Sequence, residues 1–239
     1  MTDNKPLAVW ITGASSGIGK ASAKEFARVG VKVFASARRV TELDRLNKEL
    51  SEEKLHVEVL PCNVASAANV DQTAKKILAE NRIDCLINNA GITSFKPAIG
   101  NSVQELNDII NTNLLGSIYS IKSVLPSMIS NGGGKIINIL SMVVHKVFLN
   151  SSAYTASKMG LLGYTNVLRE EVRQHKIKII NISPGATNTP IWSPDMREKK
   201  SNRMMKPEEI ASLLVWIYLT KENMVTEEIV LRPVEGDLD

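Results

Sequence analysis

Short apolar runs and longer amphipathic stretches alternate along almost the whole chain. The runs predict strands at Leu7–Ile11, Val31–Ser36, His56–Pro61, Ile83–Ile87, Lys135–Leu140, Lys178–Ile182 and Glu228–Leu231. The stretches between them predict helices at Ile18–Val29, Thr41–Glu52, Ala67–Glu80, Val103–Ser130, Ala153–His175 and Pro207–Tyr218. Strands that alternate with helices favour βαβ units, whose right-handed crossovers build a parallel sheet covered on both faces. The expected fold class is α/β: a single-domain, Rossmann-type doubly wound parallel sheet of about seven strands with helices on both faces.

Length and composition agree with one globular domain over residues 1–239. Hydrophobic residues make up 44% of the chain and charged residues 23%, which is ordinary for a folded protein, and no repeat or linker divides it. The net charge of +4 is a mild excess that suits an anionic small molecule. The basic doublets Arg38-Arg39 and Lys199-Lys200 are too short for a nucleic-acid-binding stripe, so no nucleic acid is expected as a partner.

The cysteines and the apolar runs indicate the cellular setting. Cys62 and Cys85 form neither a disulfide framework nor a CxxC pair, and buried thiols are the expectation for both. The opening stretch MTDNKPLAVWITG lacks the basic leader and long apolar core of a secretory signal. The longest apolar run, Ile210–Leu219, is far shorter than the roughly 20 residues that a membrane span requires. We expect a cytoplasmic protein with no membrane partner.

One segment, residues 186–206, interrupts the alternation. It is polar and follows a predicted strand directly, yet it holds several apolar side chains: Trp192, Met196, Met204 and Met205. Long irregular segments in compact domains are usually functional, and ligands bind such sheets at the carboxyl ends of the strands. We expect a substrate-binding lid here; the alternative is an ordinary surface excursion.

A glycine-rich turn joins the first strand to the first helix. Its sequence, TGASSGIG at residues 12–19, has the spacing GxxxGxG instead of the common GxGxxG. Glycines let the backbone approach a pyrophosphate closely, and the helix N-terminus offers free N–H groups to phosphates. The alternative is a turn that is merely tight. The residues expected to contact a dinucleotide here are Gly13, Ser15, Ser16, Gly17, Ile18 and Gly19.

Further motifs follow in order along the chain: NNAG at 88–91, Asn113, Ser141, the pair Tyr154-x-x-x-Lys158, and Pro184-Gly185. Together with TGASSGIG, these motifs resemble the short-chain dehydrogenase/reductase family over most of the chain. The resemblance implies a dinucleotide-binding oxidoreductase domain that moves a hydride between a nicotinamide cofactor and a carbonyl or alcohol group.

The end of the second strand bears on the choice of cofactor. NAD sites carry an acid about 20 residues beyond the glycines, which accepts the ribose hydroxyls. Here Ala37 stands in that place and Arg38 follows it. A guanidinium can hold a 2′-phosphate with two charge-assisted hydrogen bonds, whereas a carboxylate repels it. The sequence therefore predicts NADP(H), with Arg39 either sharing the phosphate or facing solvent.

Other cofactor contacts are implied by the resemblance. Asn63 stands where many relatives have Asp before Val64, and its carbonyl oxygen can still accept from the adenine amino group. For Asn88 a structural role between strand ends is expected instead of a cofactor contact. The remaining residues that the resemblance places against the cofactor are Asn89, Ala90, Gly91, Tyr154, Lys158, Pro184, Gly185, Thr187 and Thr189.

The pair Tyr154 and Lys158 has the spacing of neighbours on one helical face. Carbonyl reduction needs a proton donor at the oxygen, and a nearby ammonium favours a tyrosinate and lowers the pKa of the phenol from about 10. The resemblance makes Tyr154 the general acid in reduction and the general base in oxidation. It makes Lys158 the residue that lowers the tyrosine pKa and hydrogen-bonds the nicotinamide ribose, and Ser141 the group that orients the substrate oxygen. It assigns Asn113 to holding a relay water; the alternative for Asn113 is a buried amide in a helix kink.

The substrate region is less specific. Met142, Phe148 and Trp192 lie near the expected crevice and predict, with Ser141 and Tyr154, a largely apolar substrate pocket; the alternative is that they only pack the core. The identity of the carbonyl compound stays open, because one fold serves many substrates. The three histidines form no ligand cluster by spacing, and no metal is expected.

Two further expectations concern partners and rival functions. The resemblance implies a homodimer or homotetramer through the long helices Val103–Ser130 and Ala153–His175. The main alternative function is an NADP(H)-binding regulatory protein without turnover; the presence of Ser141, Tyr154 and Lys158 together argues against it.

Overall fold

The computed structural model describes residues 5–220 and 223–238. Its strands are β1 (Leu7–Thr12), β2 (Lys32–Ala37), β3 (Glu58–Pro61), β4 (Arg82–Asn88), β5 (Gly134–Ile139), β6 (Ile177–Pro184) and β7 (Glu228–Leu231). Its α-helices are α1 (Gly17–Arg28), α2 (Val40–Glu52), α3 (Ala67–Glu80), α4 (Val103–Ile110), α5 (Gly116–Ser130), α6 (Ser152–Val172), α7 (Pro194–Lys200) and α8 (Pro207–Leu219). All strands predicted from the sequence are present.

The strands form one sheet of seven in the order β3-β2-β1-β4-β5-β6-β7, and every neighbouring pair is parallel. The chain builds outward from β1 to β3, then crosses back to β4 and builds the other half, so the direction of winding reverses between β1 and β4. The predicted doubly wound α/β fold is confirmed. In such sheets the crevice at the reversal point, beyond the carboxyl ends of the strands, is where ligands bind.

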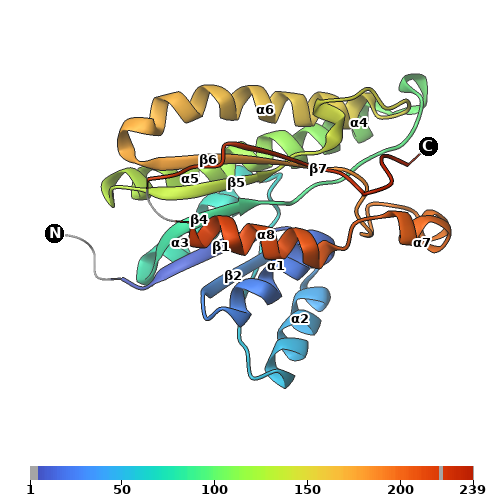
Figure 1. Ribbon diagram of the computed structural model, residues 1–239. Coiled ribbons are helices and arrows are strands. Elements are labelled where there is room, and N and C mark those ends of the chain that lie inside the picture. Colours follow the sequence, from blue (N-terminus) through green and yellow to red (C-terminus); the bar gives the residue numbers. More distant parts are fainter. Residues whose placement is uncertain (1–4, 221–222, 239) are drawn as a thin grey trace.

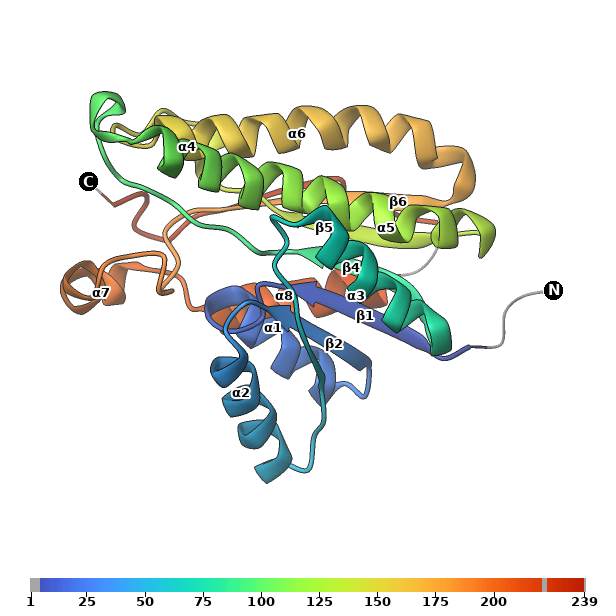
Figure 2. The same ribbon diagram turned by 180° about the vertical axis from the view of Figure 1, so that it is seen from behind.

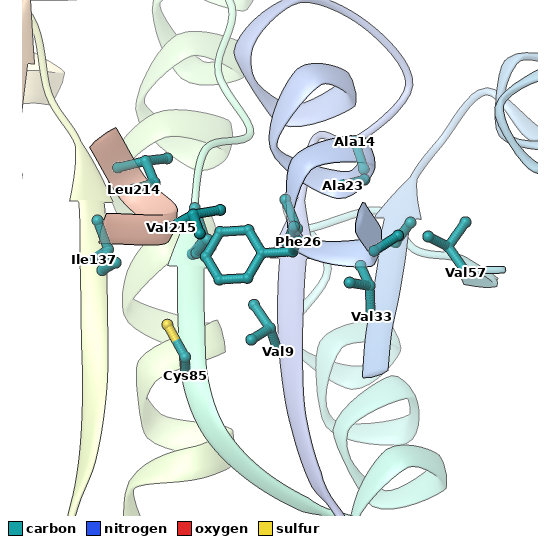
Figure 3. Close-up of a cluster of buried hydrophobic side chains, with 14 of the residues drawn as sticks. Val9, Ala14, Ala23, Phe26, Val33, Val57, Cys85, Ile137, Leu214 and Val215 are labelled. Carbon is teal, nitrogen blue, oxygen red and sulfur yellow. The ribbon is translucent and has the colours of Figure 1, made fainter. Parts of the chain in front are cut away.

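The two faces of the sheet are covered by different helices (Figures 1 and 2). Alternate residues of a strand point to opposite faces, and β1 shows this directly. Val9 and Ile11 join the buried cluster beneath α1, α2 and α8, whereas Ala8 and Trp10 join the cluster beneath α3, α5 and α6. Figure 3 shows the first cluster, in which Phe26 lies over β1 and β4. Burial on both faces explains why these strands read as continuous apolar runs.

The helix predicted over Val103–Ser130 is divided in the structure. It runs as α4, then as a π-helical turn over Asn111–Leu115, then as α5. Two contacts with other parts of the chain accompany the break. The side chain of Asn113 turns inward to bond with the backbone of Ile92, and Gly116 lies so close to Val64 that an added Cβ would be 2.8 Å from its Cγ2. π-Helical turns of this kind are frequent at functional sites.

Residues 186–206 are more ordered than the sequence suggested. Ser193 caps a helix by accepting from the backbone N–H of Met196 at 3.2 Å, and Pro194 begins α7. The two ends of the segment are joined, since Met205 N–H donates to the Ala186 carbonyl at 3.0 Å and Asn188 N–H to that of Met205 at 2.9 Å. The segment is therefore a closed loop that carries α7 beyond the carboxyl edge of the sheet (Figure 1).

Candidate active site

A cavity of about 560 Å³ lies at the carboxyl ends of the strands. Most residues that the sequence placed in the site line it: Gly13, Ser15, Ser16, Gly17, Ile18, Arg38, Arg39, Val64, Asn89, Ala90, Gly91, Ser141, Met142, Phe148, Tyr154, Lys158, Pro184, Gly185, Thr187, Thr189 and Trp192. Gly19, Asn63 and Asn113 are not among the lining residues. The cavity thus joins the glycine-rich turn at one end to the Tyr–Lys pair and the aromatic residues at the other.

The glycine-rich turn has a backbone that only glycine accommodates well. Gly13 and Gly17 have φ values of +68° and +55°. A Cβ on Gly13 would lie 2.7 Å from the Cα of Ala90, and one on Gly19 would collide with the carbonyl of Gly13. Gly17 also begins α1, whose first N–H groups have no carbonyl partner within the helix. This close backbone with free N–H groups fits a bound diphosphate.

The loop after β4 is fastened to the glycine-rich turn. The Asn89 amide donates to the carbonyls of Thr12 and Gly13 at 3.0 and 3.1 Å, and the N–H groups of Asn89 and Ala90 donate to the Thr12 hydroxyl at 3.1 and 3.2 Å. These bonds hold the two sides of the crevice at a fixed separation, which a rigid cofactor site requires.

Asn88 takes the structural role expected for it, in a ladder of buried amides that the sequence analysis missed. Its amide donates to Asn138 at 3.0 Å, and that of Asn138 donates to Asn181 at 3.1 Å. The three residues are in register on β4, β5 and β6, and Asn181 also bonds with Thr165 of α6. The ladder links the sheet to the helix that carries Tyr154 and Lys158.

At the end of β2, Arg39 is held over the phosphate turn. Its Nη2 donates to the hydroxyls of Ser15 and Ser16 at 2.9 and 2.7 Å, and its Nε donates to Ser15 at 3.3 Å. Arg38 is exposed and also lines the cavity, and Ala37 is buried where an acid would stand in an NAD site. This end of the cavity is therefore cationic. Asp237 is the one carboxylate among the described lining residues, and it lies at the other end, where it pairs with Lys146 near Phe148.

Asn63 is turned toward its own loop. Its side-chain amide oxygen accepts from the Ala65 N–H at 3.2 Å, and its backbone N–H donates to the side-chain oxygen of Asn69 at 2.7 Å. The neighbours Cys62 and Val64 line the cavity instead. The carbonyl oxygen has a second lone pair for an adenine amino group, so the contact with Asn63 stays a prediction.

Tyr154 and Lys158 lie one turn apart on α6 and face the same cavity, 7% and 4% exposed. The Lys158 Nζ lies 5.7 Å from the centre of the Tyr154 ring and donates to the Ile139 carbonyl at 2.6 Å. Ser141, at the end of β5, hydrogen-bonds with Tyr154. The structure therefore brings the three predicted catalytic side chains together.

Burial is the main influence on the protonation of Tyr154 and Lys158. Burial raises the pKa of Tyr154 to about 12, and the hydrogen bond from Ser141 offsets only part of that rise. Burial also lowers the pKa of Lys158 to about 8. The lowering of the tyrosine pKa by Lys158, whose ammonium donates to the Ile139 carbonyl, stays a prediction. Tyr154 is thus fully protonated at neutral pH.

Asn113 is fully buried behind the cavity, in the π-helical turn. Its amide donates to the Ile92 carbonyl at 2.9 Å and to Ser157 at 3.0 Å, and its oxygen accepts from the Ile92 N–H at 2.8 Å. These bonds fit the kink alternative and fix the loop that follows Gly91. The relay water assigned to Asn113 by resemblance stays a prediction.

Aromatic side chains form the outer part of the cavity. Trp192 and Phe95 stack with ring centres 5.1 Å apart and an interplanar angle of 14°, and both line the cavity with Phe148. The sequence analysis missed Phe95, although its place shortly after the NNAG motif was a usable signal. It also missed Asp237 and Leu238, which line the cavity from the far end of the chain.

Within residues 5–220 and 223–238, no helix is long and apolar enough to cross a membrane. In the same residues, no group of three or more His, Cys, Asp or Glu side chains is placed to hold a metal ion.

Comparison with known proteins agrees with this geometry. A family model described as short chain dehydrogenase matches residues 7–200. Sepiapterin reductase of Chlorobaculum tepidum is 32% identical over 236 residues, covering 95% of this chain and 96% of the relative. NADP-dependent 3-hydroxy acid dehydrogenase of Schizosaccharomyces pombe is 32% identical over 240 residues, covering 94% and 92%.

Among solved structures, a metagenomic short-chain oxidoreductase in complex with NADP is similar with a TM-score of 0.83 and 29% identity, covering 96% of this chain and 97% of that one. The alcohol dehydrogenase of Thermococcus sibiricus complexed with 5-hydroxy-NADP has a TM-score of 0.87 and 27% identity, covering 98% and 99%. With the family model matching most of its length and most of the motif residues lining one cavity, this chain belongs to the short-chain dehydrogenase/reductase family.

Proposed function

We propose that the protein is an NADP(H)-dependent oxidoreductase that transfers a hydride between the nicotinamide and a carbonyl or alcohol substrate. The observation that carries the proposal is the meeting of Ser141, Tyr154 and Lys158 in the same cavity as the glycine-rich turn. Membership of a dehydrogenase family supports the reaction class. An NADP-dependent relative, and solved structures of similar proteins that contain NADP or 5-hydroxy-NADP, support the cofactor.

The cofactor fits the residues present. The turn around Gly13 and Gly17 would hold the diphosphate, and Arg39 with Arg38 would hold the 2′-phosphate. The backbone of Ala90 and Gly91 would lie along the nicotinamide ribose, within reach of Lys158. Pro184, Gly185, Thr187 and Thr189 would flank the nicotinamide carboxamide.

In the reaction, the bound cofactor supplies or accepts the hydride at the substrate carbon. Ser141 donates a hydrogen bond to the substrate oxygen and orients it. Tyr154 gives its phenolic proton to that oxygen in reduction and takes it back in oxidation. Lys158 stabilises the phenolate that proton transfer leaves. A tyrosine pKa of about 12 keeps Tyr154 protonated at neutral pH, which is the form that donates a proton in reduction.

The pH dependence of reduction is expected to follow Lys158. Below pH 8 the ammonium is charged and stabilises the developing phenolate; above pH 8 it loses its proton, while Tyr154 stays protonated up to about pH 12. The value of kcat/KM for reduction at saturating NADPH should therefore be level at lower pH and fall above about 8. A Lys158→Met variant should lose this inflection. A wild-type profile that is level to pH 10, or that falls on the acid side, would contradict this role of Lys158.

The proposed function is tested by following the absorbance of NADPH with a panel of ketones and aldehydes, beside NADH. Turnover with NADPH supports the proposal, and the panel ranks substrates. The alternative is a regulatory protein that binds NADP(H) without turnover. Tight binding of NADPH, with no oxidation over a broad panel and no effect of changes at Tyr154, would favour that alternative.

Two further parts of the proposal concern motion and assembly. We propose that residues 186–206, with α7, act as a lid; slower hydrogen exchange of residues 190–203 when NADPH is added would support this. We also propose a homodimer or homotetramer through α4, α5 and α6, where Val103, Met159 and Val167 are 73%, 47% and 62% exposed. Light scattering after size exclusion measures the assembly, and Val167→Glu is expected to shift it toward monomer.

A further inference from the structure

The segment that follows β7, Arg232–Leu238, turns back over the active-site cavity. It leaves β7 where the Gly185 N–H donates to the Leu231 carbonyl at 2.7 Å. Pro233 is buried and packs against Gly185, where an added Cβ would lie 3.1 Å from the Pro233 ring. A tight turn follows, closed by a bond of 2.9 Å from the Gly236 N–H to the Pro233 carbonyl, with φ of +88° at Gly236. This turn delivers Asp237 and Leu238 to the cavity wall.

The Asp237 carboxylate fastens the segment in this position. Its side chain is only 6% exposed. It accepts from Nε and Nη2 of Arg232 at 3.2 and 2.9 Å, and from Nζ of Lys146 at 2.9 Å. These partners hold the pKa of Asp237 below its usual range. A carboxylate with a paired arginine and lysine is already satisfied, so its charge serves the fold of the segment and is not spare for a cationic substrate.

The same segment contacts two chain stretches that contribute residues to the cavity wall. Lys146 follows Ser141 on the connection to α6, and its ammonium lies 5.4 Å from the ring centre of Phe148, which lines the cavity. On the other side, Glu235 pairs with Nε of Arg203 at 3.3 Å, and Arg203 belongs to the lid segment, residues 186–206. Arg232–Leu238 therefore links the stretch after the catalytic serine to the lid.

We propose that Arg232–Leu238 is a specificity-determining wall of the substrate pocket, in which Leu238 contacts the apolar arm of an uncharged ketone or aldehyde. Asp237 is a positioning residue that holds this wall in place. The inference rests on the proposed function and adds the substrate class to it. The surrounding side chains agree with an apolar arm, since Met142, Phe148 and Trp192 line the same cavity. Contacts that remove apolar substrate surface from water discriminate arms of different length.

The test compares a series of methyl ketones whose alkyl or aryl arm grows stepwise. In the wild type, kcat/KM should rise with arm length. In Leu238→Ala and in Asp237→Asn, the ratio of kcat/KM between the longest and the shortest ketone should fall about tenfold. The matched control is Asp71→Asn, which removes a carboxylate from an exposed pair with Lys75 on α3 and should leave the ratio at its wild-type value. A ratio unchanged in both Leu238→Ala and Asp237→Asn would overturn the proposal.

A second measurement needs no turnover. Hydrogen exchange of the protein without cofactor should speed up in residues 232–238 and 142–150 in Asp237→Asn, and should not change there in Asp71→Asn. Binding of the longest ketone to the NADP-loaded protein, followed by tryptophan fluorescence, should weaken about tenfold in Leu238→Ala. If no ketone is turned over, the proposed function fails. Hydrogen exchange and ketone binding still test whether residues 232–238 form a wall of the pocket. Unchanged exchange in Asp237→Asn, or unchanged ketone binding in Leu238→Ala, would refute it.

Discussion

A Tyr154→Phe variant is expected to lose about a thousandfold in kcat/KM for ketone reduction, because general acid catalysis contributes on the order of 10² to 10⁴. The change removes one oxygen from a side chain that is 7% exposed and leaves its ring in place on α6. Neither the ring packing nor the cationic end of the cavity is altered. The affinity for NADPH, measured by fluorescence titration, should therefore stay near the wild-type value while turnover is lost.

The chain offers a matched control for this experiment on the same helix. Tyr164 is half-buried on α6, packs beneath the sheet and is not among the cavity-lining residues. Tyr164→Phe removes the same atom from α6 without touching the site, and kcat/KM should remain within about twofold. If Tyr154→Phe kept more than about a tenth of wild-type kcat/KM, Tyr154 could not be the main proton donor.

The fold was predictable because its signals are local. Each strand buried on both faces reads as an apolar run, and βαβ units with right-handed crossovers predict a parallel sheet covered on both faces. The break of the helix at Asn111–Leu115 was not predictable, because it depends on bonds between Asn113 and Ile92, which are distant in sequence and meet only in the folded chain. Helix α7 was hidden for a different reason: it is short, and the polar residues around it read as loop.

In the site as well, some features have local sequence signals and others depend on contacts between distant residues. The glycine-rich turn and the Tyr–Lys pair carry their geometry within a few residues, so the sequence located both. The outer part of the cavity is not encoded locally. Phe95 stacks on Trp192 and Asp237 pairs with Lys146, and in each contact the partners are separated by more than a third of the chain, so no local pattern predicts them. The pKa of Tyr154 could not be read from the spacing either, since it depends on how completely the phenol is removed from water.

The cofactor preference rests on two arginines, and Arg39→Ala is expected to weaken NADPH binding by about 10- to 100-fold while changing NADH binding little. The physical reason is that charge-assisted hydrogen bonds to a dianionic 2′-phosphate are lost, whereas NADH carries no such group. The hydroxyls of Ser15 and Ser16 hold the Arg39 guanidinium over the turn before any phosphate arrives, so little side-chain freedom is lost on binding. Arg38→Ala should act in the same direction.

Titration of each variant with NADPH and NADH checks this, with Arg45→Ala as the control. Arg45 lies on α2 near the same strand end, but it pairs with Glu42 and is 70% exposed, so its loss should leave the NADPH-to-NADH affinity ratio at its wild-type value. The converse change, Ala37→Asp, restores an acid at the end of β2; it should repel the phosphate and accept the ribose hydroxyls, shifting preference toward NADH. Because the arginines and the acid act through opposite charges on one phosphate, both routes must lower the ratio. If the NADPH-to-NADH affinity ratio is unchanged after the loss of Arg38 and Arg39, other residues must contact the 2′-phosphate.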